Sequence, residues 1–323
     1  MSKKKSFGKI NGREAVVVGI IIAMIALFSI LSPTFRTYTT FTSVLDMSYY
    51  IALMAIGVTF PLITGGVDLS IGTGLICYSL FGGYLVVHKD VPVIVALLAC
   101  LILSILIGLL NGVLVAFMDL PPFLATLCTC MITRGLGSLL SGGFGVSWPS
   151  SLEAEGWFRN IFRITVDGQN IPVGIFVVVA LVLLMNFVLN HTKIGRYTIA
   201  IGSNKEATKL AGVNVKFYHV FAYVISSFFA GLAAIAYSGT YVTIYPGSGA
   251  GFELDAIGGA IVGGVSATGG VGSITGAFLG VLVITLMKVG LPFVGLQANW
   301  QQIFTGLVLI AAVLVDVVKK KKN

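Results

Sequence analysis

The polar segment 190–218 holds the residues best suited to binding another protein. Ser203 and Glu206 form the S-x-x-E capping-box pattern, and Gly212 follows as a residue that readily ends a helix in the left-handed conformation. This spacing predicts a helix of about two turns over 204–211. Its apolar face would consist of Ala207, Leu210 and Ala211. A helix this short is marginal alone in water, so we expect the rest of the chain or a partner protein to hold it.

The same segment is rich in charge and is flanked by apolar stretches on both sides. Its charged residues are Lys193, Arg196, Lys205, Glu206, Lys209 and Lys216. A short, part-apolar helix among basic residues at the face of a membrane body is typical of a docking element. Segment 190–218 is therefore the first candidate for an interaction with a soluble protein.

Composition identifies the chain as a membrane protein. It is 57% hydrophobic and 10% charged, with a mean hydropathy of +1.00, which excludes a soluble globular domain. Apolar stretches of about 20 residues alternate with short polar breaks, which is typical of an all-α polytopic protein. We predict about ten spans: 15–32, 44–64, 70–88, 92–117, 121–141, 172–190, 219–244, 253–266, 271–291 and 297–318. The eighth is too short to cross the membrane as one straight helix.

The basic residues predict an orientation. With the N-terminus in the cytoplasm, fourteen Lys and Arg residues fall in cytoplasmic segments and four in external ones, as the positive-inside rule requires. A single transmembrane domain, 15–318, would then have an internal loop at 191–218, an external loop at 142–170 and basic tails at 1–14 and 319–323. We expect both termini in the cytoplasm. The net charge of +8 then reports orientation and contact with anionic lipid, not nucleic-acid binding.

Few residues of the chain could catalyse a reaction or drive transport. The sequence has no G-x-x-x-x-G-K-[ST] motif, and so no P-loop for ATP. It also lacks the row of acidic or histidine residues at mid-membrane depth that a proton-coupled transporter needs. The four cysteines fall inside spans, and the three histidines are scattered. We expect no catalytic residue, metal or cofactor here, and therefore energy supplied by another protein.

The break at 64–72 is the first place where polar residues interrupt the spans. Gly65 and Gly66 allow a sharp turn, and Asp68 or Ser70 can cap the helix that follows. Asp68 is either only this cap or part of a broken-helix segment that lines a pathway near the cytoplasmic gate. Both interpretations remain open at this point.

Two further polar residues, Asn111 and Arg134, lie within spans four and five. An arginine inside a span is costly unless it faces water, reaches the surface or is paired. Each residue either locks two helices together or lines a pathway. Thr126 belongs to the same set, because small, weakly polar walls suit a hydrated passage for an uncharged solute.

Glycine is concentrated between residues 239 and 280, with 13 glycines in 42 residues. The spacings Gly259-x-x-x-Gly263 and Gly272-x-x-x-Gly276-x-x-x-Gly280 predict flat helix faces that allow close backbone approach. Such faces serve tight packing, and they also suit helices that slide past one another.

The external segment 142–170 contains a second capping-box spacing, Ser150 with Glu153, followed by an apolar stripe. A small hairpin is predicted around 166–169. The segment is either an interfacial helix on the lipid headgroups or a landing site for an external protein. Glu153, Glu155 and Glu253 are the candidate contacts of such a partner.

Six collinear segments together resemble one family. They are GGVDLSIG (65–72), LLNGVLVAFMDLPPFLATL (109–127), TRGL (133–136), GRYTIAIGSNKEATKLAGVNV (195–215), GFELDAIGGAIVGGVSATGGVGS (251–273) and NWQQIFTGLVLIAAVLVD (299–316). From about residue 33 to 318, the chain is similar to the permease subunit of ribose/galactose-type sugar ABC transporters. Cys128 departs from the pattern, since relatives commonly have Gly after the T-L pair.

The resemblance implies a monosaccharide importer in the cell membrane. Its partners would be an ABC ATPase that binds ATP and Mg, an extracytoplasmic sugar-binding protein and a second permease subunit. By position, 65–72 and 251–258 resemble the regions nearest the translocation route, and 195–215 resembles the segment that contacts the ATPase. The coupling residues would be Gly195, Arg196, Ser203, Asn204, Lys205, Glu206, Ala207, Leu210 and Gly212. The alternatives are a stand-alone channel or secondary carrier for a small polar solute and, third, a membrane-embedded enzyme.

Overall fold

The computed structural model describes residues 12–322, and this part of the chain is almost entirely helical. Within it, nine helices are long and apolar enough to cross a membrane. They are α1 (Gly12–Leu31), α2 (Tyr38–Ile63), α3 (Ile71–Lys89), α4 (Val93–Ala116), α5 (Pro122–Leu140), α6 (Gly174–His191), α9 (Val215–Thr240), α11 (Ile274–Gly290) and α12 (Ala298–Lys322). The predicted all-α polytopic fold is confirmed. Most of the basic segment 1–14, and Asn323 of the segment 319–323, lie outside the described residues.

Shorter elements join the long helices. Three are α-helices: α7 (Lys193–Ser203), α8 (Lys205–Leu210) and α10 (Phe252–Val262). Three are 3-10 helices: η1 (Pro33–Arg36), η2 (Ala154–Ile161) and η3 (Leu291–Val294). Two small antiparallel sheets complete the list, β1 (Val146–Ser147) with β4 (Thr243–Ile244) and β2 (Ile164–Val166) with β3 (Gln169–Ile171).

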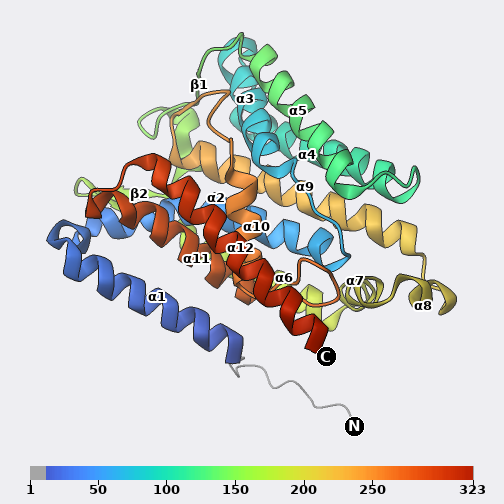
Figure 1. Cartoon of the computed structure of the whole chain (residues 1–323). Coiled ribbons are helices and arrows are strands. Elements are labelled where there is room, and N and C mark those ends of the chain that lie inside the picture. Colours follow the sequence, from blue (N-terminus) through green and yellow to red (C-terminus); the bar gives the residue numbers. More distant parts are fainter. Residues whose placement is uncertain (1–11, 323) are drawn as a thin grey trace.

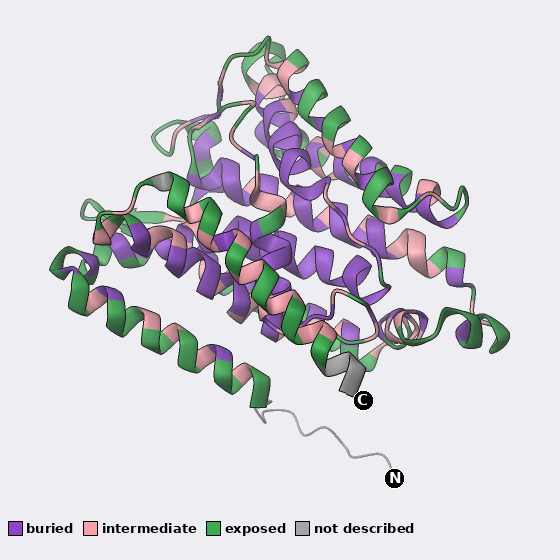
Figure 2. Ribbon diagram, in the orientation of Figure 1, coloured by how far each residue is buried: buried purple, intermediate pink, exposed green. Residues whose placement is uncertain are grey.

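Helices α2 and α9 form the centre of the helical body. Their side chains are mostly buried, whereas α1 and α12 are exposed along almost their whole length (Figure 2). α9 packs along α2 and α4, and α3 packs against α4, α5 and α9. Since the exposed surfaces of α1 and α12 are predominantly apolar, lipid is the solvent in which these two helices are stable.

Two glycines bring α4 close to α9. A Cβ atom at Gly108 would lie 2.7 Å from the carbonyl oxygen of Tyr223, and one at Gly112 would lie 2.7 Å from the Cα of Val220. Neither space admits a side chain, so this small-xxx-small face sets the distance between the two helices. The pattern lies outside the glycine-rich region that the sequence analysis singled out.

The predicted glycine faces are confirmed between α10 and α11. A Cβ atom at Gly263 would lie 2.0 Å from the carbonyl oxygen of Gly276, and one at Gly280 would lie 1.9 Å from that of Gly259. Gly272 precedes the start of α11, so it does not extend the helical face.

The eighth predicted span is a half-length helix followed by irregular backbone. Helix α10 has 11 residues and ends at Val262. Residues 263–273 are not helical. This segment passes beside the end of α2, where the backbone N–H of Gly270 donates to the carbonyl oxygen of Ile63 at 2.8 Å. The expectation that this span is too short to cross as a straight helix is confirmed.

The start of α1, the end of α12 and the pair α7–α8 lie toward one side of the body. In Figure 1 the start of α1 and the end of α12 lie at the bottom, the pair α7–α8 lies at the lower right, and the strands lie toward the upper left. The predicted orientation requires the internal segments to share one side of the membrane, and the orientation itself stays a prediction.

The external segment folds as predicted in one respect and differs in another. Strands β2 and β3 form the expected hairpin, with Asp167 and Gly168 at positive φ in its turn. Element η2 is a 3-10 helix, and its apolar stripe is divided: Phe158 and Phe162 are buried, whereas Trp157 and Ile161 are exposed. Half of the stripe therefore anchors the segment to the helical body.

Candidate functional site

Segment 192–212 contains two helices where the sequence predicted one. Helix α7 begins after Thr192, whose hydroxyl accepts from the N–H of Gly195, and it ends at Ser203. The predicted capping box is wrong, because the Ser203 hydroxyl donates to the carbonyl of Ile199 within α7. Asn204 caps α8 instead, and its Oδ1 accepts from the N–H of Ala207 at 2.9 Å. Gly212 has the predicted left-handed backbone, with φ of +81°.

Helix α8 presents its apolar residues to the outside. Leu210 is 89% exposed, and Ala207 and Ala211 are exposed beside it. Thr208 faces the body, buried, and its hydroxyl donates to the carbonyl of Asn204 at 2.7 Å. An exposed leucine side chain would be stabilised if another protein removed its apolar surface from water.

The other coupling residues divide by burial. Arg196, Ser203, Asn204, Lys205 and Glu206 are exposed and continue the surface of α8. Gly195 is buried, and a Cβ atom there would lie 1.9 Å from the carbonyl oxygen of Leu189. Its small size therefore lets α7 fold back against the end of α6, a structural role that differs from direct contact with a partner.

A second polar centre lies where the chain turns from α2 into α3. Asp68 is fully buried, and its Oδ1 accepts from the backbone N–H of Ser70 at 3.0 Å and from its hydroxyl at 2.6 Å. The Asp68 carboxylate therefore binds Ser70, the residue that precedes α3, and does not cap the turns of α3 itself. The break is an ordered corner inside the body.

Two more helices join this corner. The Asn111 amide on α4 donates to the Ser70 hydroxyl at 2.9 Å, and the Thr129 hydroxyl on α5 donates to Asn111 Oδ1 at 2.7 Å. All of these side chains are buried. Of the two roles open to Asn111, the structure supports interhelical locking.

The rest of the predicted pathway set is divided between the corner and the surface. Thr126 is buried with its hydroxyl 3.3 Å from the carbonyl oxygen of Val67, and Gly66 is buried against Tyr223. Gly65 is exposed at the end of α2. In this conformation Gly66, Asp68, Ser70, Asn111 and Thr126 form a buried polar lock, so they do not line an open passage.

Two threonines missed by the sequence analysis extend this lock. The hydroxyls of Thr73 on α3 and Thr133 on α5 lie 2.8 Å apart. Thr126, Thr129 and Thr133 follow one another at helical spacing, and all three are buried. That spacing was the signal available in the sequence, since it predicts one polar stripe along α5.

Arg134 differs from the other polar residues of α5. It is exposed within the span, on a face that also presents Met131 and Leu139. It lies within electrostatic range of the Glu253 carboxylate at the start of α10. A guanidinium at this depth needs water or a partner, so this face of α5 is a poor lipid contact.

The three candidate docking acids occupy different environments. Glu153 is exposed, and its Oε1 accepts from the backbone N–H and the hydroxyl of Ser150 at 2.9 and 2.8 Å, which lowers the pKa of Glu153 below its usual value. Glu155 is exposed and accepts from the N–H of Val93 at 3.1 Å. Glu253 is placed differently from expectation: it is half-buried inside the body, beside the space left by Gly72.

Two partly buried ion pairs connect elements that are far apart in the sequence. Arg163, after η2, pairs with Asp46 of α2, and Lys288 of α11 pairs with Asp255 in the first turn of α10. Asp255 therefore holds α10 against α11, a more specific role than the predicted helix cap. Among residues 12–322, no three His, Cys, Asp or Glu side chains gather as a metal site would require.

Comparison with known proteins gives one consistent result. Residues 40–313 match the family described as the permease component of the branched-chain amino acid transport system. The chain is 33% identical to the ribose import permease of Escherichia coli (strain K12) over 98% of its own length and 97% of that protein. It is 31% identical to the galactose/methyl galactoside import permease of Haemophilus influenzae, over 100% and 99% of the two chains. It is also 31% identical to the fructose import permease of Rhizobium meliloti, over 93% and 84%.

No solved structure matches the chain. The family match nevertheless covers α2 to α12 without a gap, and it includes the polar lock, the α7–α8 pair and the half-length α10. With its membrane-crossing helices, the chain belongs to this family of transport-system permease components and is a multi-pass membrane permease.

Proposed function

We propose that this permease is the membrane subunit of an ABC importer and that a separate ATPase drives it through α8. The observation that carries the proposal is the exposed face of α8, where Leu210 is 89% exposed while Thr208 on the opposite face is buried against the body. An apolar side chain in this position has no stabilising contact unless another protein covers it.

The energy for transport comes from outside this chain in this proposal. The sequence contains no P-loop, so ATP and Mg would bind to the partner ATPase. The basic residues of segment 192–212 place it in the cytoplasm by the positive-inside rule, which is the compartment where ATP is available. Movement of the ATPase would then push on α7 and α8, which pack against α6 and α9.

A monosaccharide is the substrate class that fits best. The relatives described above are import permeases for ribose, galactose and fructose. A sugar is uncharged and carries many hydroxyls, each costly to strip of water without replacement hydrogen bonds. It therefore needs a hydrated passage with weakly polar walls. An extracytoplasmic binding protein would deliver the sugar and supply most of the selectivity.

The passage lies at the interface of two permease subunits in this proposal. The predicted pathway residues on α3, α4 and α5 are locked together and buried, which leaves the outer face of α5 with Arg134 as the polar surface at membrane depth. A second subunit facing this surface would enclose water around Arg134 and remove the cost of exposing it to lipid. Arg134 would then line the route.

Reconstitution tests the proposal. Proteoliposomes that contain the permease and its ATPase, supplied with the binding protein, should take up ribose, galactose or fructose. Uptake should occur only when ATP is present on the side of the membrane that holds the ATPase. Uptake at the same rate by this chain alone without ATP would favour the secondary-carrier alternative. Isothermal titration is a second check: sub-micromolar sugar binding to the purified permease would contradict the passage model.

A further inference from the structure

A deep crevice separates α1 from α12 on the side of the molecule that holds the basic segments. It has a volume of about 730 Å³, and its floor is formed by α10 and α11. Its walls are almost wholly apolar, with Val17, Ile20 and Met24 on one side and Val308, Ala312 and Val315 on the other. Cavities of about 300–1,000 Å³ hold whole small ligands, so this volume is sufficient for one.

The position of the crevice restricts what can fill it. Helices α1 and α12 are the most exposed spans of the described chain (Figure 2). We therefore expect the crevice between them to face the hydrocarbon of the bilayer. An apolar hollow in this position does not hold water well, because its walls offer few hydrogen-bond partners. An acyl chain is the apolar group that the surroundings supply.

The mouth of the crevice carries charge. Arg13 lies at the start of α1, exposed, and its side chain extends over the turn after α10, with Cδ 3.6 Å from the position a Cβ atom would take at Gly264. Asp316 also lines the mouth, and its Oδ2 accepts from the Ser266 hydroxyl at 2.7 Å. Arg13 and Asp316 form no ion pair with each other, so the guanidinium can bind a phosphate.

We propose that this crevice binds one anionic phospholipid, with an acyl chain between α1 and α12 and the headgroup phosphate on Arg13. The sequence adds four positive charges in Lys319, Lys320, Lys321 and Lys322 at the end of α12. Basic pockets between membrane helices on the cytoplasmic side select anionic headgroups for this reason. The bound lipid would hold α1 in place beside a body that it contacts mainly through α11.

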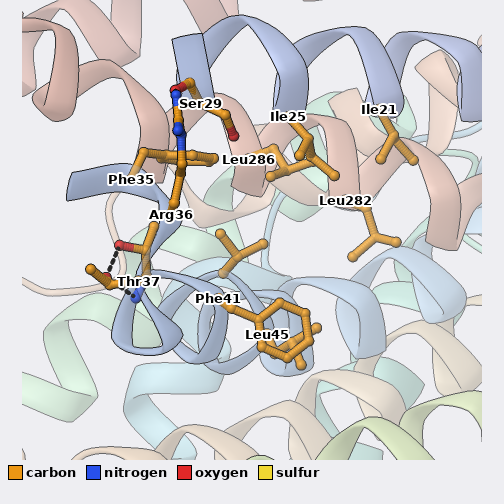
Figure 3. A pocket seen from close by; sticks show the side chains of 12 residues that line it. Ile21, Ile25, Ser29, Phe35, Arg36, Thr37, Phe41, Leu45, Leu282 and Leu286 are labelled. Atoms are coloured by element: carbon orange, nitrogen blue, oxygen red, sulfur yellow. Dashed lines mark hydrogen bonds between the residues drawn. The ribbon is translucent and has the colours of Figure 1, made fainter. Parts of the chain in front are cut away.

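A second hollow beside α1 serves as the internal comparison. It is smaller, about 290 Å³, and lies between α1, α2 and α11, toward the C-terminal end of α1 (Figure 3). Its arginine, Arg36, donates from Nε and Nη2 to the carbonyl of Ser29 at 2.7 and 2.5 Å. Arg36 is thus turned onto the backbone of α1, whereas Arg13 lies at the open mouth of the larger crevice.

The test measures which lipids stay with the purified permease. The full chain is placed in nanodiscs of equal parts phosphatidylglycerol and phosphatidylcholine, extracted into mild detergent, and analysed for retained lipid by native mass spectrometry. We expect retained phosphatidylglycerol to exceed phosphatidylcholine. Arg13→Gln should lower that ratio about fivefold, the selectivity expected of one basic residue near an anionic headgroup. Arg13→Lys should keep most of it, and Arg36→Gln should leave it unchanged.

A second variant tests the crevice itself. Ala312→Phe places a larger side chain in the wall and should reduce retention of both lipids while the melting temperature shows that the chain is folded. An unchanged lipid ratio in Arg13→Gln would overturn the assignment of the anionic headgroup to Arg13. Unchanged retention in Ala312→Phe would overturn the crevice as the site. An equal loss of selectivity in Arg36→Gln would also overturn it, since the effect would then follow total charge.

Discussion

Two polar breaks in this chain are both built from glycine and small polar residues that form turns and caps, and they end in opposite environments. The break at 64–70 uses Gly, Asp and Ser to build a corner that is buried and bonded to α4 and α5. The break at 192–212 uses Thr, Asn and Gly to cap two helices whose outer face stays exposed. In both breaks the caps and turns are made by residues two or three positions apart in the sequence. The packing around them decides whether the result is a lock or a docking surface.

The largest effect should come from the exposed break. Leu210→Asp removes an anchor that would be buried in the complex with the ATPase, and it adds a charge there. ATP-driven uptake should fall by about tenfold or more, the loss typical of an interface hot spot, while the melting temperature of the permease stays unchanged. Glu206→Lys should likewise lower ATP-driven uptake without changing the melting temperature. Leu210→Met serves as the control and should retain uptake. Normal uptake in the Asp variant would remove α8 from the coupling surface.

The buried break should respond in stability. Asn111→Leu removes the donor to Ser70 and the acceptor of Thr129, so it leaves buried hydroxyls with fewer partners and should cost about 1–3 kcal/mol of unfolding free energy. Thermal unfolding in detergent measures the loss. The matched control is Asn190→Leu on the exposed end of α6, which should unfold as the parent does. If Asn111→Leu and Asn190→Leu unfold at the same temperature, the polar lock does not stabilise the body.

A smaller change tests whether α8 depends on its own cap. Asn204→Ala removes the acceptor for the N–H of Ala207, a loss of about 1 kcal/mol for a helix N-cap. Hydrogen exchange in 205–210 should become several times faster, with no change in the rest of the chain. Asn204→Asp keeps an acceptor and should restore protection. Exchange that stays slow in the Ala variant would show that tertiary contacts alone hold α8.

The smallest effect is expected at the external segment. Reversing Glu153 and Glu155 to Lys should weaken docking of the binding protein a fewfold, and more at low salt, because rim charges act mainly on encounter. Because Ser150 holds the pKa of Glu153 below its usual value, the contribution of Glu153 should persist in mildly acidic medium and fade only as pH falls through that lowered pKa. Docking that ignores both reversals would favour the interfacial role of the segment.

Much of the fold could be predicted because each membrane span is a continuous run of apolar residues that can be recognised in the sequence. The half-length eighth span, the glycine contact of α10 with α11, the hairpin at 166–169 and the left-handed Gly212 all follow from short stretches of sequence. The boundary between α7 and α8 was harder to predict, because two neighbouring residues there can each cap a helix. Ser203 and Asn204 are both good N-caps, and only the length of α7 decides which one is used.

The polar lock could not be predicted because its members lie far apart in the sequence. Asp68, Asn111 and Thr129 each have an ordinary local explanation, and their hydrogen bonds exist only once α3, α4 and α5 are packed. Glu253 illustrates the same limit. It follows a polar loop and so resembles a surface residue, yet the close approach of Gly72 draws it into the body.

The shortness of α10 also matters while the protein is being made. A segment enters the bilayer on its own when about 20 apolar residues can span it, and α10 offers 11 before the backbone becomes irregular. Its glycines fit against α11, so the pair completes the crossing that neither the helix nor its following loop achieves alone. In a nascent chain truncated after α10, we therefore expect this segment to stay accessible to a water-soluble reagent, whereas in a chain extended through α11 it should be protected by the membrane. The two elements enter the membrane as one unit of biosynthesis.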